Sequence, residues 1–297
     1  HYQHNYENKN NLDFWDQKTP RFDLSCWDGN KCPNNTYTTH LFANRAIEII
    51  ENSKNSSSPL FLYISFTSPH LPYQAPQDVI DLYNETISNP LRRVYVAMLH
   101  VLDNAIQNIT KSLEKNNMLD DTLILFMSDN GAMVDMRRDG EGGGMGSNWP
   151  LRGSKRTLYE GGVRVPSFVT GAGISSSRKG TIVNGLFHAM DWFPTLLTMA
   201  AKQINPLWSW KDVITLKSNE PEFTGSDARD QWSYISGETD TPARYELLLE
   251  THALGSRTGT GNALIVGNWK ILLRTASLWP YTTNIGSNDG WFGGINS

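Results

Sequence analysis

The sequence lacks the features that mark several large classes of protein. Its formal net charge is −4 at pH 7, so it has no basic excess of the kind that binds nucleic acid, and it contains no DNA-binding motif. No apolar run reaches the length of about 20 residues that a membrane span requires. No glycine-rich loop ends in the lysine and serine or threonine of a P-loop. We therefore expect no nucleic-acid partner, no transmembrane segment and no nucleotide site.

Cysteine is scarce as well. Cys26 and Cys32 are the two cysteines of the chain, and no nearby histidine spacing supplies the further ligands of a zinc site. Their close spacing favours a small disulfide loop, with two free thiols as the alternative. Potential N-glycosylation sequences occur at Asn34, Asn55, Asn84 and Asn108. Together these features predict a glycoprotein of the secretory pathway, either lysosomal or extracellular.

The rest of the composition is typical of a globular protein, with 39% hydrophobic and 19% charged residues. A length of 297 residues allows one large α/β domain, or one domain and part of another. The chain starts at His1 and not at methionine, so we expect a processed chain or a fragment.

Two short apolar runs on either side of an amphipathic stretch predict a βαβ unit. Leu60–Phe66 and Leu123–Met127 are almost entirely apolar, as in strands that are buried on both faces of a parallel sheet. Leu91–Lys115, between them, has apolar residues at helical spacing. Strands joined by such a crossover run parallel in one sheet.

The residues that follow these two strands are candidates for a ligand site. Parallel strands end at the same edge of a sheet, so His70 should lie near Asp129 and Asn130. Adjacent carboxylate and amide oxygens suit Ca²⁺ or Mg²⁺. The alternative is a strand followed by a simple Asn-Gly turn, with His70 as an ordinary loop histidine.

Further segments complete an α/β protein. Helices are predicted over Thr38–Asn52 and His188–Ala201, and strands over Val163–Thr170, Glu246–Thr251 and Ala263–Arg274, the last bent into a hairpin at Gly267-Asn268. Clean periodicity ends near Lys202. We therefore predict a main domain over residues 1–204 and the start of a smaller α+β subdomain over residues 205–297.

Basic residues crowd the segment between the glycine-rich stretch and the strand predicted at Val163. They are Arg152, Lys155, Arg156 and Arg164. An exposed basic cluster is usually a solvated face, and Lys155 would then be a surface lysine. The neighbouring glycines and the entry into a buried strand favour an anion pocket instead.

Several motifs of the chain resemble those of type I sulfatases, particularly the arylsulfatase B-like branch. They are Phe-Leu-Tyr-Ile-Ser-Phe-x-Ser-Pro-His-x-Pro, Phe-Met-Ser-Asp-Asn-Gly, Asn-Trp-Pro-Leu-Arg-Gly-x-Lys-x-Thr-Leu-Tyr-Glu-Gly-Gly-Val-Arg-Val-Pro, His-x-x-Asp-Trp-Phe-Pro-Thr-Leu and Gly-x-Trp-Lys-Ile-Leu. The resemblance covers residues from about 36 to 275. It implies an alkaline phosphatase-like α/β fold with a doubly wound, mostly parallel sheet.

The resemblance also implies the roles of particular residues. Asp129 and Asn130 match two calcium ligands, His70 matches the histidine that assists the leaving oxygen, and Lys155 matches the lysine that binds the sulfate group. A cation and a lysine would offset charge on the sulfate oxygens. A histidine can donate a proton to a departing alcohol. The implied reaction is hydrolysis of a sulfate ester in a small molecule or a glycan.

The nucleophile of this family has no counterpart in the sequence. It is a formylglycine made from the first residue of Cys/Ser-x-Pro-x-Arg, and neither Cys26, Cys32 nor any serine is followed by proline and arginine at these offsets. The family's opening Asp-Asp pair and its Lys-x-His segment are missing too. We therefore expect a fragment that is inactive alone. The alternatives are a non-catalytic module that binds sulfated glycans and, less closely, a phosphoester hydrolase or phosphotransferase of the same fold. The sequence does not indicate an oligomeric state.

Overall fold

The computed structural model describes residues 4–6, 9–11, 37–134, 144–155, 157–217, 227–251 and 261–273. The chain divides into two compact units, residues 1–119 and 120–297, and each is described by itself. The domain boundary expected after residue 204 stays a prediction. Cys26, Cys32 and Asn34 lie outside the described residues, so the disulfide stays a prediction as well.

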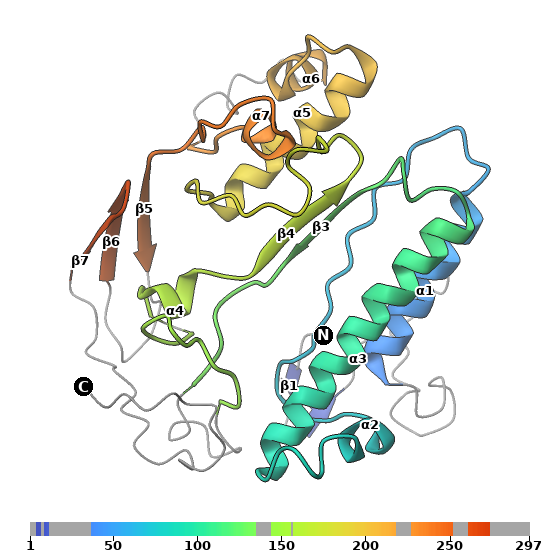
Figure 1. Cartoon of the computed structure of the whole chain (residues 1–297), viewed down its shortest axis with the longest axis vertical. Coiled ribbons are helices and arrows are strands. Elements are labelled where there is room, and N and C mark those ends of the chain that lie inside the picture. The colour runs from blue at the N-terminus through green and yellow to red at the C-terminus, as the bar shows by residue number, and fades with distance from the viewer. Residues whose placement is uncertain are drawn as a thin grey trace. The chain divides into compact units, whose positions relative to one another are not determined.

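The first unit is built on two long helices, α1 (Thr38–Ser53) and α3 (Pro90–Lys115), which lie side by side (Figure 1). Both confirm the predicted helices. The side chain of Asn89 accepts the backbone N–H of Arg92 at 3.1 Å and so caps α3, while Pro90 suits its first turn. The buried residues between the helices are Ala43, Ala46 and Ile50 of α1 and Ala97, Met98, Val101, Leu102 and Ala105 of α3.

Smaller elements complete this unit. Helix α2 (Gln77–Asp81) packs on α3, and strands β1 (His4–Tyr6) and β2 (Lys9–Asn11) pair antiparallel. No helix in the described part of the chain is long and apolar enough to cross a membrane.

The strand predicted over Leu60–Phe66 is not formed. These residues belong to no strand, although their side chains alternate as in one. Phe66 packs edge-on against Phe42 of α1, with ring centroids 6.4 Å apart, whereas Phe61 and Tyr63 are 80% and 81% exposed. The prediction was wrong because apolarity and β-propensity favour an extended chain but do not provide a hydrogen-bonding partner for it.

The second unit contains a two-stranded ladder at its centre. Strand β3 (Leu123–Met127) confirms the predicted strand, and it pairs antiparallel with β4 (Ser167–Gly171). Strand β4 begins at Ser167 and not at Val163 because Glu160–Val163 forms a short helix, α4. Within the described ranges β3 has no other ladder partner, so the parallel pairing expected with residues 60–66 is not observed.

Helices cover this ladder, and the predicted helix over His188–Ala201 is confirmed with shifted ends. It begins as the 3-10 helix η2 (Ala189–Asp191) and continues as α5 (Trp192–Ile204), followed by α6 (Trp210–Lys217) and α7 (Trp232–Ser236). The buried core comprises Ile174, Trp232, Tyr234 and Ile235, against which Leu123, Val169, Phe187, Trp192 and Met199 pack. Ladder, α5 and α7 therefore share one core.

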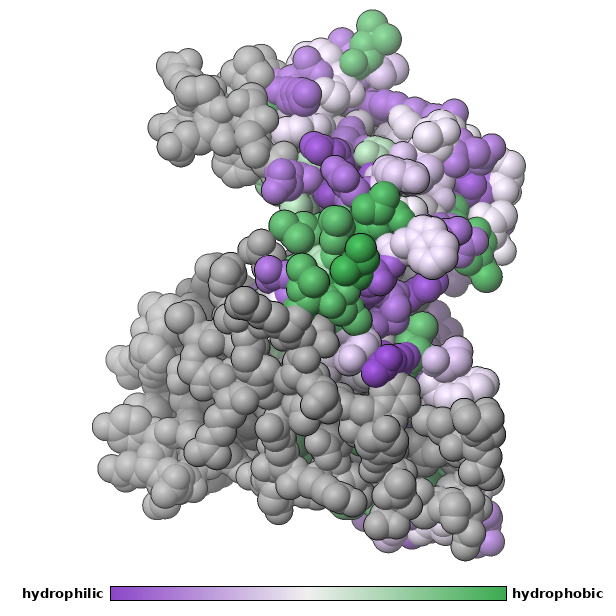
Figure 2. All heavy atoms as spheres, turned by 90° about the vertical axis from the view of Figure 1, so that its left-hand side faces the viewer, coloured by the Kyte–Doolittle hydropathy of each residue, from purple (hydrophilic) through white to green (hydrophobic). Residues whose placement is uncertain are grey.

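The last element is a three-stranded antiparallel sheet of β5 (Glu246–Thr251), β6 (Gly261–Val266) and β7 (Trp269–Leu273). The predicted hairpin at Gly267-Asn268 is confirmed, and Gly267 has a φ of 54°. One face of the sheet is covered, since Leu247 and Ala263 are buried. Figure 2 shows apolar side chains gathered on the other face, where Leu248, Leu264, Ile271 and Leu273 are exposed.

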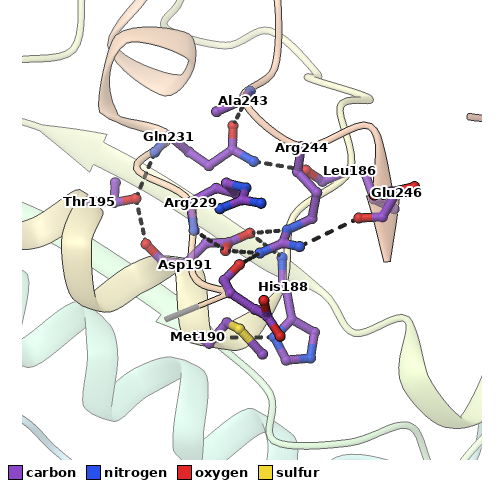
Figure 3. A network of polar contacts seen from close by, with 11 residues as sticks. Leu186, His188, Met190, Asp191, Thr195, Arg229, Gln231, Ala243, Arg244 and Glu246 are labelled. Carbon is purple, nitrogen blue, oxygen red and sulfur yellow. Dashed lines mark hydrogen bonds and ion pairs between the residues drawn. The ribbon is translucent and has the colours of Figure 1, made fainter. Parts of the chain in front are cut away.

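A buried ion pair joins the start of α5 to the approach to β5 (Figure 3). The carboxylate of Asp191, which is fully buried, accepts hydrogen bonds from Nε and Nη2 of Arg244 at 2.8 and 2.5 Å. It also accepts the backbone N–H groups of His188 and Arg229, at 2.9 and 2.8 Å. Hydrogen bonding to Asp191 raises the pKa of Arg244. The other labelled members of the network are Leu186, Met190, Thr195, Gln231, Ala243 and Glu246.

Replacing Arg244 by methionine should destabilise the second unit strongly. The Asp191 carboxylate would remain buried without its counter-charge, which costs about 3–5 kcal/mol of unfolding free energy. Lys202→Met is the control in the same unit, because Lys202 pairs with Glu238 and the two side chains are 26% and 48% exposed, and such a partly exposed pair contributes about 1 kcal/mol or less. Urea denaturation measures both variants. Equal losses of stability would contradict the importance of the buried pair.

His188 should make the stability of the chain depend on pH. Burial lowers the pKa of His188, and its Nδ1 accepts the backbone N–H of Met190 at 3.2 Å, which requires the neutral ring. The stabilisation is therefore present above the unfolded pKa of about 6.5 and is lost as the pH falls from there towards the folded pKa.

The variant His188→Asn keeps a side-chain acceptor at this helix start but does not titrate. Between about pH 7.5 and 5.5, its unfolding free energy should fall less steeply than that of the wild-type chain. Urea denaturation at a series of pH values measures the two slopes. Identical slopes would show that His188 does not contribute to the pH dependence.

Candidate functional site

The turn after β3 carries the two candidate cation ligands. Asp129 is exposed, and its Oδ1 accepts the backbone N–H of Asn130 at 2.8 Å. The side-chain amide of Asn130 is half-buried, and its NH₂ group donates to the Gly131 carbonyl at 3.0 Å. The side-chain oxygen of Asn130 has no hydrogen-bond partner among the described residues. A Cβ atom at Gly131 would overlap the carbonyl oxygen of Gly161, so this backbone contact requires glycine.

Helix α4 lies directly against this turn. The Gly131 N–H donates to the carbonyl of Gly162 at 3.0 Å, and the Gly161 N–H donates to the carbonyl of Arg152 at 2.6 Å. Both helix glycines are buried. The short helix therefore binds the Asp129–Gly131 turn through the Gly162 carbonyl. It binds the loop that carries Arg152 and Lys155, called the basic loop below, through the Gly161 N–H.

A single side chain, that of Asn148, joins the turn and the basic loop a second time. Its Oδ1 accepts the N–H of Ala132 at 2.8 Å, while its Nδ2 donates to the carbonyls of Ala132 and Gly153 at 2.9 and 3.0 Å. The backbone N–H of Lys155 donates to the same Ala132 carbonyl at 3.0 Å. The structure thus brings together the two segments that carry Asp129, Asn130 and Lys155.

The basic loop retains positive charge. Lys155 is half-buried, and no described carboxylate pairs with its ammonium group. The guanidinium of Arg152 lies over the ring of Tyr159, 4.2 Å from its centroid, and Arg164 is exposed. Arg156 lies outside the described residues. This arrangement can attract an anion, since it presents cations on a loop whose backbone is fixed by hydrogen bonds.

His70 belongs to the first unit. It is exposed, and its Nδ1 lies 2.9 Å from the carbonyl oxygen of Leu71. A carbonyl accepts only, so Nδ1 carries the proton in this contact and Nε2 can donate only when the ring is charged. Ser68, two residues earlier, is held by Thr39, with their hydroxyl oxygens 2.9 Å apart. The expected proximity of His70 to Asp129 stays a prediction.

The donor set for a metal is partial. In the parts of the chain that the structure describes, no group of three or more His, Cys, Asp or Glu side chains could hold a metal ion. The oxygens of Asp129 and Asn130 fit a hard cation in kind, but Ca²⁺ takes about 6–8 oxygen ligands. These two side chains could therefore supply part of a coordination shell and no more.

The asparagines of the described glycosylation sequences are all exposed. They are Asn55, Asn84 and Asn108. Asn84 also accepts a hydrogen bond from the Arg93 guanidinium. Exposure is necessary for a glycan, and glycosylation at these sites stays a prediction.

Comparison with known proteins places the chain in a family. The family model described as Sulfatase matches residues 1–202, more than half of the sequence. The chain belongs to the sulfatase family. Arylsulfatase J of Mus musculus is 32% identical over 270 residues, which are 91% of this chain and 40% of that protein. Choline-sulfatase of Rhizobium meliloti is 31% identical over 202 residues, 56% of this chain and 36% of that one. The chain spans less than half the length of these two sulfatases.

Two solved structures show the same fold. Ps i-CgsB in complex with k-i-k-neocarrahexaose aligns with a TM-score of 0.65 at 24% identity, covering 83% of this chain and 48% of that one. BT4656 in complex with D-glucosamine-2-N,6-O-disulfate aligns with a TM-score of 0.61 at 15% identity, covering 82% and 62%. At these identities the likeness concerns the fold alone. It confirms the predicted alkaline phosphatase-like α/β fold class.

The sequence did not single out Asn148 as a residue of the candidate site. It stands 16 residues from Ala132, and nothing in a single sequence connects an asparagine to a backbone group at that separation. The weak signal was its place at the start of the motif that contains Lys155.

The variant Asn148→Asp should loosen the site. The carboxylate cannot donate to the half-buried carbonyls of Ala132 and Gly153 and would place a negative charge against both. The Gly153 carbonyl would lose this hydrogen bond, and the Ala132 carbonyl would keep only the bond from the Lys155 N–H. We expect a loss of about 1–3 kcal/mol of unfolding free energy, measured by urea denaturation. Asn184→Asp makes the same chemical change at an exposed position and should be nearly neutral. A neutral effect at Asn148 would contradict its bridging role.

Proposed function

We propose that the protein to which this chain belongs hydrolyses sulfate esters, and that this chain supplies the sulfate-binding lysine, the leaving-group histidine and two cation ligands. The observation that carries the proposal is the double link, through α4 and Asn148, between the turn of Asp129 and the loop of Lys155 in a sulfatase-family chain. Such a link can hold a cation and a lysine at fixed positions around one anionic group.

The proposed roles follow from the chemistry of each side chain. The ammonium of Lys155, which has no described carboxylate partner, would bind sulfate oxygens and offset the charge that develops on them. The charged ring of His70 would donate its Nε2 proton to the departing alcohol. A divalent cation, Ca²⁺ or Mg²⁺, would be held in part by Asp129 and Asn130 and would supply Lewis-acid stabilisation.

The chain as given should not turn over sulfate esters alone. Covalent catalysis of this kind needs an activated nucleophile, and no residue of this sequence stands in a formylglycine motif. Lys155 and His70 can position a sulfate group and stabilise charge, but neither replaces the attacking hydroxyl. We therefore propose that a further segment of the whole protein contributes the nucleophile.

The substrate class we propose is a sulfate ester of a small molecule or a glycan, and the location is the secretory pathway, lysosomal or extracellular. The location is supported by the exposed glycosylation sequences. The competing proposal is a non-catalytic module that binds sulfated glycans. It differs in its outcome, because it predicts binding without hydrolysis even in the longer protein.

Lys155→Met in the longer protein should lower kcat/KM for an aryl sulfate about 10²–10³-fold, because it removes stabilisation that is concentrated on the reacting group. Lys179→Met is the control, since Lys179 is an exposed lysine of the same unit and should leave the rate unchanged. Equal rates for the two variants would contradict the role of Lys155.

An assay of the 297-residue chain, with and without added Ca²⁺, completes the experiment. No hydrolysis by this chain and cation-dependent hydrolysis by the longer protein are the expected results. Cation-dependent turnover by this chain above its own Lys155→Met variant would show that another residue acts as nucleophile. Binding of a sulfated glycan by a longer protein that never hydrolyses it would favour the non-catalytic module.

A further inference from the structure

We propose that Lys270 of β7 and Glu160 of α4 form a positioning pair, through which the β5–β7 sheet fixes the turn of Asp129 and the loop of Lys155. The pair touches neither residue directly and acts through the backbone of α4. A role of this pair in catalysis rests on the function proposed above. The structural coupling between the sheet and the two segments does not depend on that function.

The contact itself is short and partly shielded from solvent. The Lys270 ammonium donates to Oε1 of Glu160 at 2.7 Å, and the two side chains are 15% and 37% exposed. Charges that are partly removed from water interact more strongly and are less screened by salt than exposed pairs. Because the two residues are 110 positions apart in the sequence, the pair connects separate elements of the second unit.

The alternation of β7 directs Lys270 towards the covered side of its sheet. Its neighbours Trp269 and Ile271 are 82% and 61% exposed, and they point to the opposite face. Lys270 is opposite Ile265 of β6, and both are half-buried. Helix α4 lies next to this sheet (Figure 1). The lysine thus crosses from the sheet to the first residue of the helix.

A restraint on α4 also restrains the candidate site, because α4 cannot move without moving the two segments that it contacts. A Cβ at Gly161 would overlap the carbonyl of Gly153, and one at Gly162 would overlap the carbonyl of Thr157. The helix backbone therefore packs directly on the basic loop, and it also accepts the Gly131 N–H at 3.0 Å. A displacement of α4 would break contacts to both segments at once.

The helix also needs an external tether. It contains only 4 residues, and a helix of one turn has too few internal hydrogen bonds to be stable by itself. Without Lys270, the Glu160 carboxylate would lose the partner that holds it and would become an unpaired negative charge on the helix that packs against the loop of Lys155. Both effects would weaken the binding of an anion.

Amide hydrogen exchange on the full 297-residue chain tests the coupling. Lys270→Met should lower the protection of the amides of Gly131, Lys155 and Gly161 about tenfold or more, with the β3–β4 ladder unchanged, because only the local opening becomes easier. Lys202→Met is the matched control. Lys202 pairs with Glu238 at 2.8 Å elsewhere in the same unit, so its loss should leave these three amides protected.

Rescue separates positioning from a general loss of stability. Lys270→Arg should keep the protection, and Glu160→Lys combined with Lys270→Glu should restore part of what each single change removes. Equal protection of the three amides in Lys270→Met and Lys202→Met would overturn the proposal. So would a failure of both the arginine variant and the charge-swapped variant to restore protection.

Affinity for inorganic sulfate distinguishes this proposal from the proposed function. If both hold, Lys155→Met and Lys270→Met each weaken sulfate binding. If Lys155→Met leaves sulfate binding unchanged while Lys270→Met still exposes the three amides, the positioning pair stands and the function assigned to Lys155 falls. If Lys155→Met weakens binding and Lys270→Met changes neither readout, the function stands and the pair is overturned.

Discussion

The candidate site depends on a close approach of two backbone segments, at Gly131 and at Gly161-Gly162. A Cβ at Gly131 would overlap the carbonyl oxygen of Gly161, and the N–H of Gly131 donates to the carbonyl of Gly162 across the contact. Cβ atoms at Gly161 and Gly162 would instead overlap backbone carbonyls of the loop that carries Lys155. Protein interiors tolerate such approaches only where glycine leaves the space. A methyl group at Gly131 would force the turn away from α4, and one at Gly161 or Gly162 would force α4 away from the loop of Lys155. The positions of Asp129 and Lys155 both follow from this contact, because each lies within a few residues of it.

Local elements were predictable where their determinants are local. The apolar stripe of α3, the apolar run of β3 and the Gly267-Asn268 turn each depend on residues that lie close together in the sequence, and each was found close to its predicted bounds. Segment 60–66 shows the limit. Its composition gives an extended conformation with alternating exposure, but strand formation depends on a partner that the segment itself does not encode.

The sequence indicated the residue types of the candidate site but not the contacts that hold those residues in place. Asp129, Asn130, Lys155 and His70 stood out because they lie in motifs that resemble a known family. Asn148, Glu160 and Lys270 belong to the same motifs, yet their contacts join residues that are 16 and 110 positions apart. The same is true of Asp191 and Arg244, 53 positions apart, whose buried pair holds α5 and the approach to β5 together. Long-range polar contacts of this kind need coordinates, because no local pattern constrains their partners.

We propose above that Lys155 and its loop form a sulfate-binding site that backbone hydrogen bonds hold in place. A titration of the ¹⁵N-labelled chain with inorganic sulfate, followed by amide chemical shifts, tests it most directly. We expect saturable shifts at Lys155 and at Ala132, whose carbonyl accepts the Lys155 N–H, and we expect Lys155→Met to abolish them. Shifts that are absent, or that persist unchanged in Lys155→Met, would contradict a sulfate site at Lys155 and would leave Lys155 a lysine without a role in binding.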